Sequence, residues 1–270
     1  MLLLLLSCTH RPLPTSQPTI GGDRPAMLVA PSGWDGAQPL PVVFLLHGLG
    51  SSAKQQDRYM RFSRVVDELD FLLVIPDGLP RSKDGRAAWN ATDYCCSPDG
   101  GDDVAYLTGL MDELEGMGAE GFYFTGHSNG GFMSYRMACE VPDRIGAIAG
   151  LAGSTWLEPT GCAANAPVDV LQIHGTDDST VPYTGKPGKY PGAEETITRW
   201  ADRAGCTDTT QAESLNLVLR PGDDTRRTVW DCPEPHRVEL WTIDNAGHIP
   251  LVNRDYAHEV VSWLLADRAQ

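Results

Sequence analysis

"FYFTGHSNGGFMSYRMACE", residues 122–140, is the stretch that decides the fold. An apolar, aromatic run leads into Gly126-His127-Ser128-Asn129-Gly130, and the residues that follow have a helical pattern. In a G-x-S-x-G corner between a strand and a helix, the serine adopts strained backbone angles, and small residues on either side leave room for the turn. The pattern therefore predicts that Ser128 is presented at the tip of a sheet. A tight turn without chemistry is the simpler alternative.

Strand and helix patterns alternate on both sides of this corner. Several apolar runs are nearly uninterrupted, which is typical of strands buried on both faces of a sheet. We predict strands in 26–34, 40–48, 71–78, 121–125, 145–151, 168–173 and 237–243, and helices in 53–69, 102–114, 129–140, 193–204 and 254–266. A polar loop is expected at 81–101 and a small hairpin at 207–235. The alternation predicts an α/β fold: one domain with a doubly wound, mainly parallel sheet and no large lid.

A serine nucleophile needs a base and a carboxylate, and the ends of parallel strands are where such groups meet. In the chain order of α/β-hydrolases, the acid and then the histidine follow the serine. Of the histidines beyond Ser128, His248 alone lies in a loop after the last predicted strand, and we assign it as the base. The loop "HGTDDSTVPY" after strand 168–173 offers Asp177 and Asp178 as the acid, and the spacing does not choose between them.

The remaining part of such a site is an oxyanion hole. One donor is expected to be the backbone N–H of Asn129, which directly follows the serine. We expect the second from the N–H of Leu49, in the loop after strand 40–48. Trp89 and Tyr183 are candidates to flank the mouth of the site and contact substrate, with core or rim packing as the alternative for each.

The net charge of the chain and the sequence of its N-terminus indicate which partners it can bind and where in the cell it is expected. The chain has 36 acidic and 21 basic side chains, a formal charge of −15, which argues against binding nucleic acid through its phosphates. No apolar run of about 18 residues follows the N-terminus, so we expect no membrane-spanning helix. Residues 1–8, "MLLLLLSC", resemble the end of a bacterial lipoprotein signal in which Cys8 would be lipidated. A flexible tether at 9–20 and a catalytic domain at 21–270 would follow in an exported protein, secreted or lipid-anchored at the cell envelope.

Six cysteines remain besides Cys8: Cys95, Cys96, Cys139, Cys162, Cys206 and Cys232. An even number is consistent with three disulfides in an oxidising compartment, although six cysteines allow 15 pairings. We expect the adjacent Cys95 and Cys96 to bond to different partners. The spacings contain no CxxC pair beside clustered histidines, so no zinc site is predicted.

Together these residues resemble the poly(hydroxybutyrate) depolymerase and feruloyl/acetylxylan esterase family of α/β-hydrolases. The similar stretches are collinear over roughly residues 25–265: "FLLHGLGSSA", "PDG", "WNATDYCC", "DDVAYL", "GHSNGGFMSYRMACEVPDRIGAIAGLAG", "IHGTDDSTVPY", "RWADRAGC" and "GHIPL". The resemblance implies that Asp178 is the acid and that Cys206 pairs with Cys232. It also implies that the other four cysteines tie the Trp89 loop to neighbouring helix ends. Family members usually have Trp-Pro after the histidine, whereas this chain has "GHIPL".

The expected function is that of a serine carboxylic ester hydrolase, which works through an acyl-enzyme and requires no metal or cofactor. The ester is left open among feruloyl, acetyl and hydroxyalkanoate esters, which can be borne on polymers. A peptidase or an acyltransferase on the same scaffold is the alternative within enzymes. A surface lipoprotein that binds without catalysis is the alternative from another class.

Overall fold

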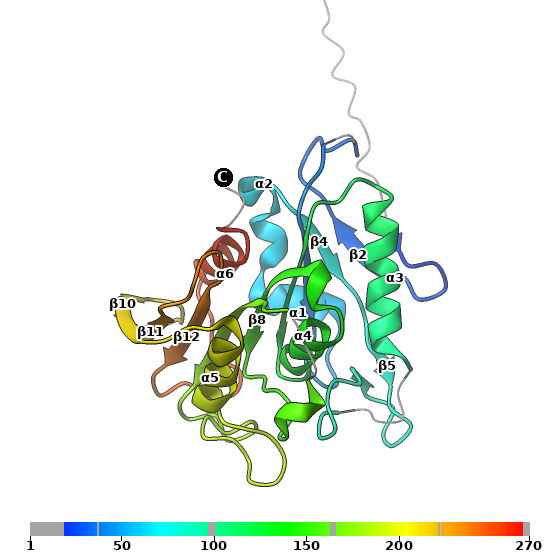
Figure 1. Ribbon diagram of the computed structural model, residues 1–270. Coiled ribbons are helices and arrows are strands. Elements are labelled where there is room, and N and C mark those ends of the chain that lie inside the picture. Colours follow the sequence, from blue (N-terminus) through cyan, green and yellow to red (C-terminus); the bar gives the residue numbers. More distant parts are fainter. Residues whose placement is uncertain are drawn as a thin grey trace, which may run out of the picture.

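One long sheet organises the chain in the computed structural model, which describes residues 19–36, 38–96, 101–162, 166–220, 222 and 224–266. Its ten strands run in the order β1-β2-β4-β3-β7-β8-β9-β12-β11-β10 (Figure 1). They are β1 (Thr19–Ile20), β2 (Ala26–Val29), β3 (Val42–Leu46), β4 (Leu72–Ile75), β7 (Phe122–His127), β8 (Ile145–Leu151), β9 (Asp169–Gly175), β10 (Thr209–Leu215), β11 (Thr225–Trp230) and β12 (Val238–Ile243). A short separate pair is formed by β5 (Leu79–Pro80) and β6 (Ala87–Ala88).

The centre of the sheet is parallel, from β4 through β3, β7, β8 and β9 to β12. Every residue of β3 and β4 is buried, as their uninterrupted apolar runs predict for strands covered on both faces. Every residue of β9 and β12 is buried as well, although these strands include polar side chains. Antiparallel strands complete both edges, with β1 and β2 on one side and β11 and β10 on the other. The carboxyl ends of the parallel strands therefore meet at one edge of the sheet.

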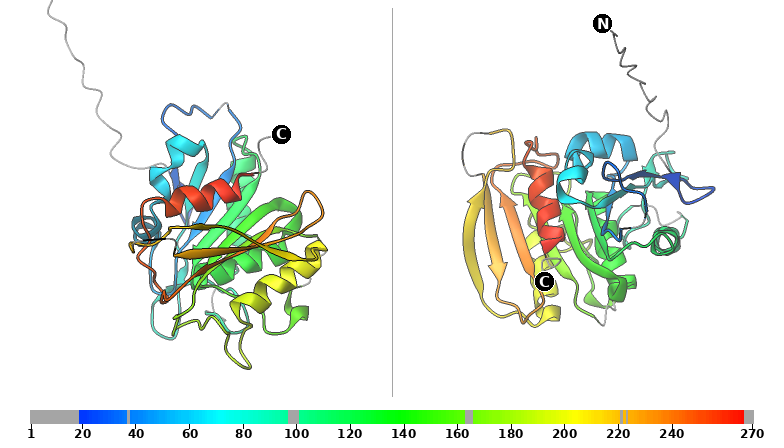
Figure 2. Two further views of the ribbon diagram at one scale, coloured as in Figure 1. Left: turned by 90° about the vertical axis from the view of Figure 1, so that its left-hand side faces the viewer. Right: turned by 90° about the horizontal axis from the view of Figure 1, so that it is seen from above.

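Helices cover both faces. One apolar core lies between the sheet and α3 (Asp103–Glu115), α4 (Asn129–Glu140) and α5 (Ala193–Ala204). The other lies between the sheet and α1 (Ala53–Met60), the 3-10 helix η1 (Phe62–Arg64), α2 (Val66–Leu69) and α6 (Tyr256–Leu264). Seen from above, α6 lies beside the α1–α2 segment (Figure 2). Two further 3-10 turns are η2 (Pro142–Arg144) and η3 (Pro159–Gly161). The predicted doubly wound α/β-hydrolase fold is confirmed.

Two predicted elements differ from the structure. The helix expected at 53–69 is broken into α1, η1 and α2, because the chain turns through a left-handed residue at Arg61 (φ 63°). Burial of both Met60 and Phe62 fixes that turn. The hairpin expected as a small excursion at 207–235 instead extends the main sheet as β10 and β11.

The predicted boundary of the tether is also wrong. Thr19–Ile20 pairs with β2 as strand β1, and the side chain of Ile20 is buried. The remainder of the tether and the signal segment with Cys8 lie outside the described residues.

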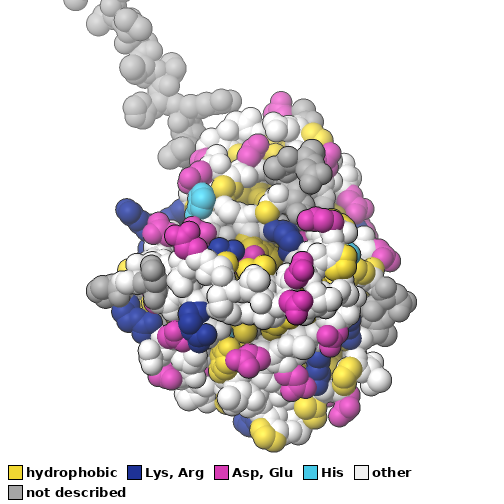
Figure 3. Space-filling view, turned by 60° about the vertical axis from the view of Figure 1, so that its left-hand side comes forward, with side chains coloured by type: hydrophobic (Ala, Val, Ile, Leu, Met, Phe, Trp, Pro, Cys, Tyr) yellow, Lys and Arg dark blue, Asp and Glu magenta, His cyan; other side chains and the backbone are white. Residues whose placement is uncertain are grey.

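The surface reflects the acidic composition. Figure 3 shows acidic side chains spread over one face among fewer Lys and Arg side chains. Within the part of the chain that the structure describes, no helix is both long and apolar enough to cross a bilayer.

Candidate active site

The corner at Ser128 joins β7 to α4, and Ser128 has the unusual angles φ 55° and ψ −118°. The two glycines of the motif are required by close approach of neighbouring backbone. A Cβ atom at Gly130 would lie 2.2 Å from the Leu46 carbonyl oxygen of β3, and one at Gly126 would lie 2.5 Å from the Gly130 carbonyl carbon. Any larger residue at either position would push β3, β7 and α4 apart. The strained serine is therefore held at the carboxyl edge of the sheet.

The ends of β9 and β12 bring two further predicted residues to this corner. His248 Nε2 lies 2.9 Å from Ser128 Oγ, and His248 Nδ1 lies 2.7 Å from Asp178 Oδ2. Ser128 is partly exposed, whereas the Asp178 side chain is fully buried. The three side chains thus form one hydrogen-bonded series from a solvent-accessible hydroxyl to a buried carboxylate.

The structure separates the two candidate acids. Asp177 is exposed and contributes its backbone N–H to the Ala246 carbonyl. Burial would raise the pKa of Asp178, but hydrogen bonds from His174, His248 and the Val181 N–H outweigh it and hold that pKa well below its usual range. Asp178 is therefore an anion, oriented toward His248.

His127, the variable residue of the motif, was not singled out from the sequence. Its Nε2–H donates to the carbonyl oxygen of His248 at 2.8 Å, so it fixes the backbone of the loop that carries His248. Burial, helped by repulsion from His248, lowers the pKa of His127 to about 4, so its ring is neutral near pH 7. No sequence signal could have revealed this role, because the position accepts many residue types.

Asn129 is placed where an oxyanion donor is expected. It is the first residue of α4, so its N–H has no partner within the helix. Its buried side chain accepts the Trp89 N–H at 2.7 Å and donates to the Trp89 carbonyl at 3.0 Å. The amide thus ties the start of α4 to the loop that contains Trp89.

The loop of Leu49 is fixed by a buried histidine. His47 Nδ1–H donates to the Gly48 carbonyl at 2.8 Å, and His47 Nε2 accepts the Gly78 N–H at 2.9 Å. Burial lowers the pKa of His47, which keeps the ring neutral and suits these two roles. Leu49 lines the cavities beside Ser128.

The prediction that Trp89 contacts substrate is wrong. Its side chain has no exposed surface, and its Nε1–H donates to the His47 carbonyl at 3.0 Å. Trp89 therefore lies behind the site, between the Leu49 loop and Asn129. Tyr183 is also displaced from the mouth: its hydroxyl is bonded to Glu194 and Thr242, and it lines a separate pocket that contains neither Ser128 nor His248.

The six cysteines form three disulfides. Cys206 bonds to Cys232, as the resemblance implies, and Cys139 at the end of α4 bonds to Cys162. Cys95 and Cys96 bond to each other, so the prediction of different partners is wrong. The Trp89 loop is closed on itself there, rather than tied to a helix end.

Two cavities meet at Ser128 and share Leu49, Ser128 and Thr180. The first, which we call the histidine-side cavity, has a volume of 440 Å³ and is lined by Tyr59, Arg86, His248 and Ile249 among others. The second, the disulfide-side cavity, has a volume of 370 Å³ and is lined by Tyr94, Cys95, Cys96, Phe132 and Tyr190 among others. Within the described ranges, no cluster of His, Cys, Asp or Glu is arranged to hold a metal ion.

Several known proteins that are similar to this chain are named as esterases. The profile of the Esterase family, described as "Putative esterase", matches residues 17–181. "Putative esterase NocK" of Nocardia uniformis subsp. tsuyamanensis is 28% identical over 227 residues, which cover 77% of this chain and 64% of that protein. "Feruloyl esterase B" of Piromyces equi is 26% identical over 239 residues, which cover 83% of this chain and 42% of that protein. The chain thus spans less than two thirds of the length of either relative.

A solved structure shows the same fold. The acetyl xylan esterase from Aspergillus awamori has a TM-score of 0.64 at 14% sequence identity. The match covers 92% of this chain and 98% of that one. At this identity the likeness concerns the fold alone.

Proposed function

Because this chain belongs to the Esterase family of α/β-hydrolases, we propose that it is a serine carboxylic ester hydrolase that works through an acyl-enzyme. The observation that carries the proposal is the series Ser128–His248–Asp178, with hydrogen bonds of 2.9 and 2.7 Å, at the junction of two cavities. This arrangement is the one that activates a hydroxyl for attack on a carbonyl.

In the first half of the reaction, Ser128 Oγ attacks the ester carbonyl carbon while His248 Nε2 takes its proton. Asp178 holds the Nδ1–H tautomer of His248 and stabilises the imidazolium that forms. The N–H groups of Asn129 and Leu49 donate to the oxyanion of the tetrahedral intermediate. When this intermediate collapses, the bond to the alcohol oxygen breaks, and His248 gives its proton to the leaving alcohol.

The second half repeats these steps with water. His248 takes a proton from a water molecule, and the resulting hydroxide attacks the acyl carbon of the ester formed with Ser128. Collapse of the second intermediate returns the proton to Ser128 Oγ and releases the carboxylic acid. Every step is supplied by residues of this chain together with water.

The proposed substrates are esters of bulky or polymer-borne groups, such as feruloyl, acetyl or hydroxyalkanoate esters. Two observations support this choice: Ser128 is partly exposed, and both cavities open beside it. Among these esters, the relative named feruloyl esterase B favours feruloyl esters. Peptidase or acyltransferase activity and binding without catalysis lack a comparable supporting observation.

We also propose that the protein is exported. Three disulfides are typical of proteins from an oxidising compartment. Lipid attachment at Cys8 stays a prediction.

The test is turnover of p-nitrophenyl acetate by the purified protein beside its Ser128→Ala variant. We expect the variant to lose about 10⁴-fold or more in kcat. Ser262→Ala, a serine of α6 remote from the site, serves as the control and should retain activity. Equal rates for the wild type and Ser128→Ala would refute the proposal. Methyl ferulate, acetylated xylan and hydroxybutyrate oligomers would then rank the acyl groups.

A further inference from the structure

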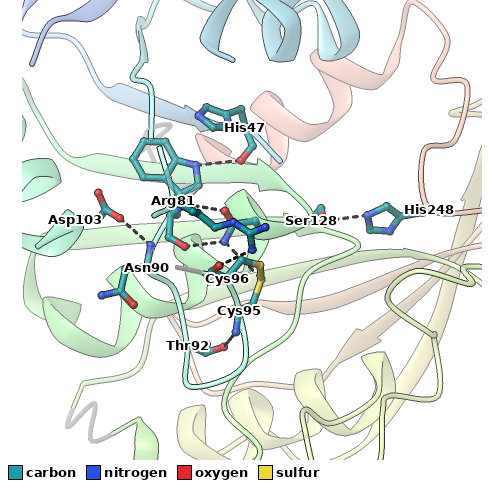
Figure 4. The surroundings of a disulfide bond; sticks show 11 residues. His47, Arg81, Asn90, Thr92, Cys95, Cys96, Asp103, Ser128 and His248 are labelled. Atoms are coloured by element: carbon teal, nitrogen blue, oxygen red, sulfur yellow. Dashed lines mark hydrogen bonds between the residues drawn. A yellow bond between two sulfur atoms is a disulfide. The ribbon is translucent and has the colours of Figure 1, made fainter. Parts of the chain in front are cut away.

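The two cavities beside Ser128 have different neighbours. Figure 4 shows the Cys95–Cys96 disulfide on one side of Ser128 and His248 on the other. His248 and Ile249 line the histidine-side cavity, and neither lines the disulfide-side cavity. If the proposed ester hydrolysis is correct, the leaving alcohol must lie within reach of His248 Nε2, which protonates it. The alcohol therefore occupies the histidine-side cavity, and the acyl group extends into the disulfide-side cavity.

The inner walls of the disulfide-side cavity are apolar. Phe132, Val181 and Tyr190 line it, and each is at least nine-tenths buried. The ring of Tyr190 packs edge-on against Phe132 at 5.5 Å and lies 5.2 Å from the ring of Tyr94. The disulfide adds a further apolar surface from Cys95. Such walls suit the hydrocarbon stem of an acyl group.

The rim of this cavity is cationic. The chain has four lysines, and three of them, Lys83, Lys186 and Lys189, lie around it. Lys83 lines the cavity directly, and Lys189 Nζ donates to the Tyr94 hydroxyl at 3.1 Å. Lys186 Nζ lies 5.9 Å from the centre of the Tyr94 ring. This clustering is notable in a chain with a formal charge of −15.

Among the described residues that line this cavity, Arg81 is the other charged side chain besides Lys83. Arg81 is paired with Asp84 and also donates to the Cys96 carbonyl, so its charge is balanced locally. Asp84 is further bound by Arg86. The hydrogen bond from Lys189 lowers the pKa of Tyr94, which is the direction expected for a phenol in a positive field.

We propose that the disulfide-side cavity binds acyl groups with an apolar stem and a terminal carboxylate, such as half-esters of dicarboxylic acids. The stem lies along Phe132, Tyr190 and the disulfide, and the carboxylate is attracted by Lys186 and Lys189 at the rim. A neutral acyl group of similar length makes the stem contacts alone. The lysines therefore determine specificity and take no part in bond making.

The test compares kcat/KM for the p-nitrophenyl half-ester of glutaric acid with that for p-nitrophenyl hexanoate. In the Lys186→Gln/Lys189→Gln variant, we expect the ratio of the anionic to the neutral ester to fall about 5-fold, as for two partly exposed ion pairs. Lys54→Gln removes the one remaining lysine, which lies on α1 and lines neither cavity, and should keep the wild-type ratio. Raising NaCl from 0.05 to 1 M should lower the wild-type ratio in the same direction.

The outcomes separate this inference from the proposed function. An unchanged ratio in the double variant, or an equal fall in Lys54→Gln, overturns the carboxylate subsite while ester hydrolysis stands. A wild-type ratio that is insensitive to salt does the same. If neither ester shows turnover that depends on Ser128, the proposed function fails, and the subsite fails with it.

Discussion

Asn129 contributes to the site through both its backbone and its side chain, and the sequence predicts only the backbone role. Its backbone N–H is the proposed oxyanion donor, and its side chain bonds the Trp89 backbone in both directions. Trp89 in turn holds the carbonyl of His47, two residues before Leu49. Both proposed donors are therefore positioned by one buried loop.

We expect Asn129→Ala to lower kcat on p-nitrophenyl acetate by about tenfold, with little change in KM. The N–H donor itself remains, so the loss should stay below the roughly 10²–10³-fold typical of removing a donor. Two buried backbone groups of Trp89 lose their partners, which loosens the loop. Asn129→Asp should lose more, because it places a buried carboxylate against the Trp89 carbonyl oxygen that accepts from the amide. An unchanged kcat in Asn129→Ala, in protein shown by circular dichroism to be folded, would contradict this role.

At this scale, sequence motifs predict the three side chains that are hydrogen-bonded in series at Ser128. Ser128 follows from the glycine pattern and His248 from chain order, but Asp177 and Asp178 were separated only by resemblance. Trp89 was misplaced because a tryptophan in a polar loop gives no sign of whether it faces the site or lies behind it. Its contacts to His47 and Asn129 join residues about 40 positions apart in the chain.

Among the elements, the three disulfides differ in the length of chain that they enclose. Cys206–Cys232 spans 26 residues, whereas Cys95–Cys96 joins neighbours. A disulfide that restricts a longer loop of the unfolded chain stabilises the fold more. The adjacent pair encloses no such loop. It lines the disulfide-side cavity and contacts the Asn129 amide at 3.5 Å.

We therefore predict opposite effects for two double variants. Cys206→Ser/Cys232→Ser should lower the free energy of unfolding by about 3 kcal/mol and leave kcat/KM nearly unchanged. Cys95→Ser/Cys96→Ser should have the smaller effect on stability and the larger one on kcat/KM. Urea denaturation and steady-state kinetics on the same preparations measure both quantities. The reverse ranking of the two variants would show that the adjacent disulfide is a structural link.

Element boundaries were predicted best where one pattern is continuous and its ends are marked. The helices at 129–140 and 193–204 and the strand at 145–151 agree with α4, α5 and β8. The prediction of one helix over 53–69 is wrong because apolar residues continue at helical spacing through Arg61. The turn at Arg61 is visible only in the structure, where the residues on either side are buried against the sheet.

For the whole molecule, the alternation of patterns was enough to predict the doubly wound fold. The alternation does not predict the number of strands in the sheet. The polar hairpin of β10 and β11 joins the sheet by pairing with the buried strand β12, and its polar sequence gives no sign of that pairing. Edge strands of this kind have few buried residues, so their sequence resembles that of a surface loop.

Stability of the whole molecule should depend on pH through His127. The folded protein lowers the pKa of His127 from 6.5 to about 4, so the unfolded chain binds the proton more readily. The stabilisation of the folded state that depends on a neutral His127 is fully present above pH 6.5. As the pH falls from 6.5 toward 4, the free energy of unfolding decreases by about 3 kcal/mol. His127→Gln, which can still donate to the His248 carbonyl, should unfold with a weaker pH dependence over that window. Parallel urea midpoints from pH 7 to 4 for the two proteins would argue against this assignment.

The backbone conformation of Ser128 also determines which substitutions at this position would stabilise the fold. Its angles, φ 55° and ψ −118°, oppose folding by about 1–3 kcal/mol for a residue with a Cβ atom, whereas glycine adopts positive φ readily. A descendant that used the fold only to bind would gain stability from a single change to glycine at this position. The presence of serine at a corner whose backbone angles favour glycine therefore weighs against the binding-only alternative.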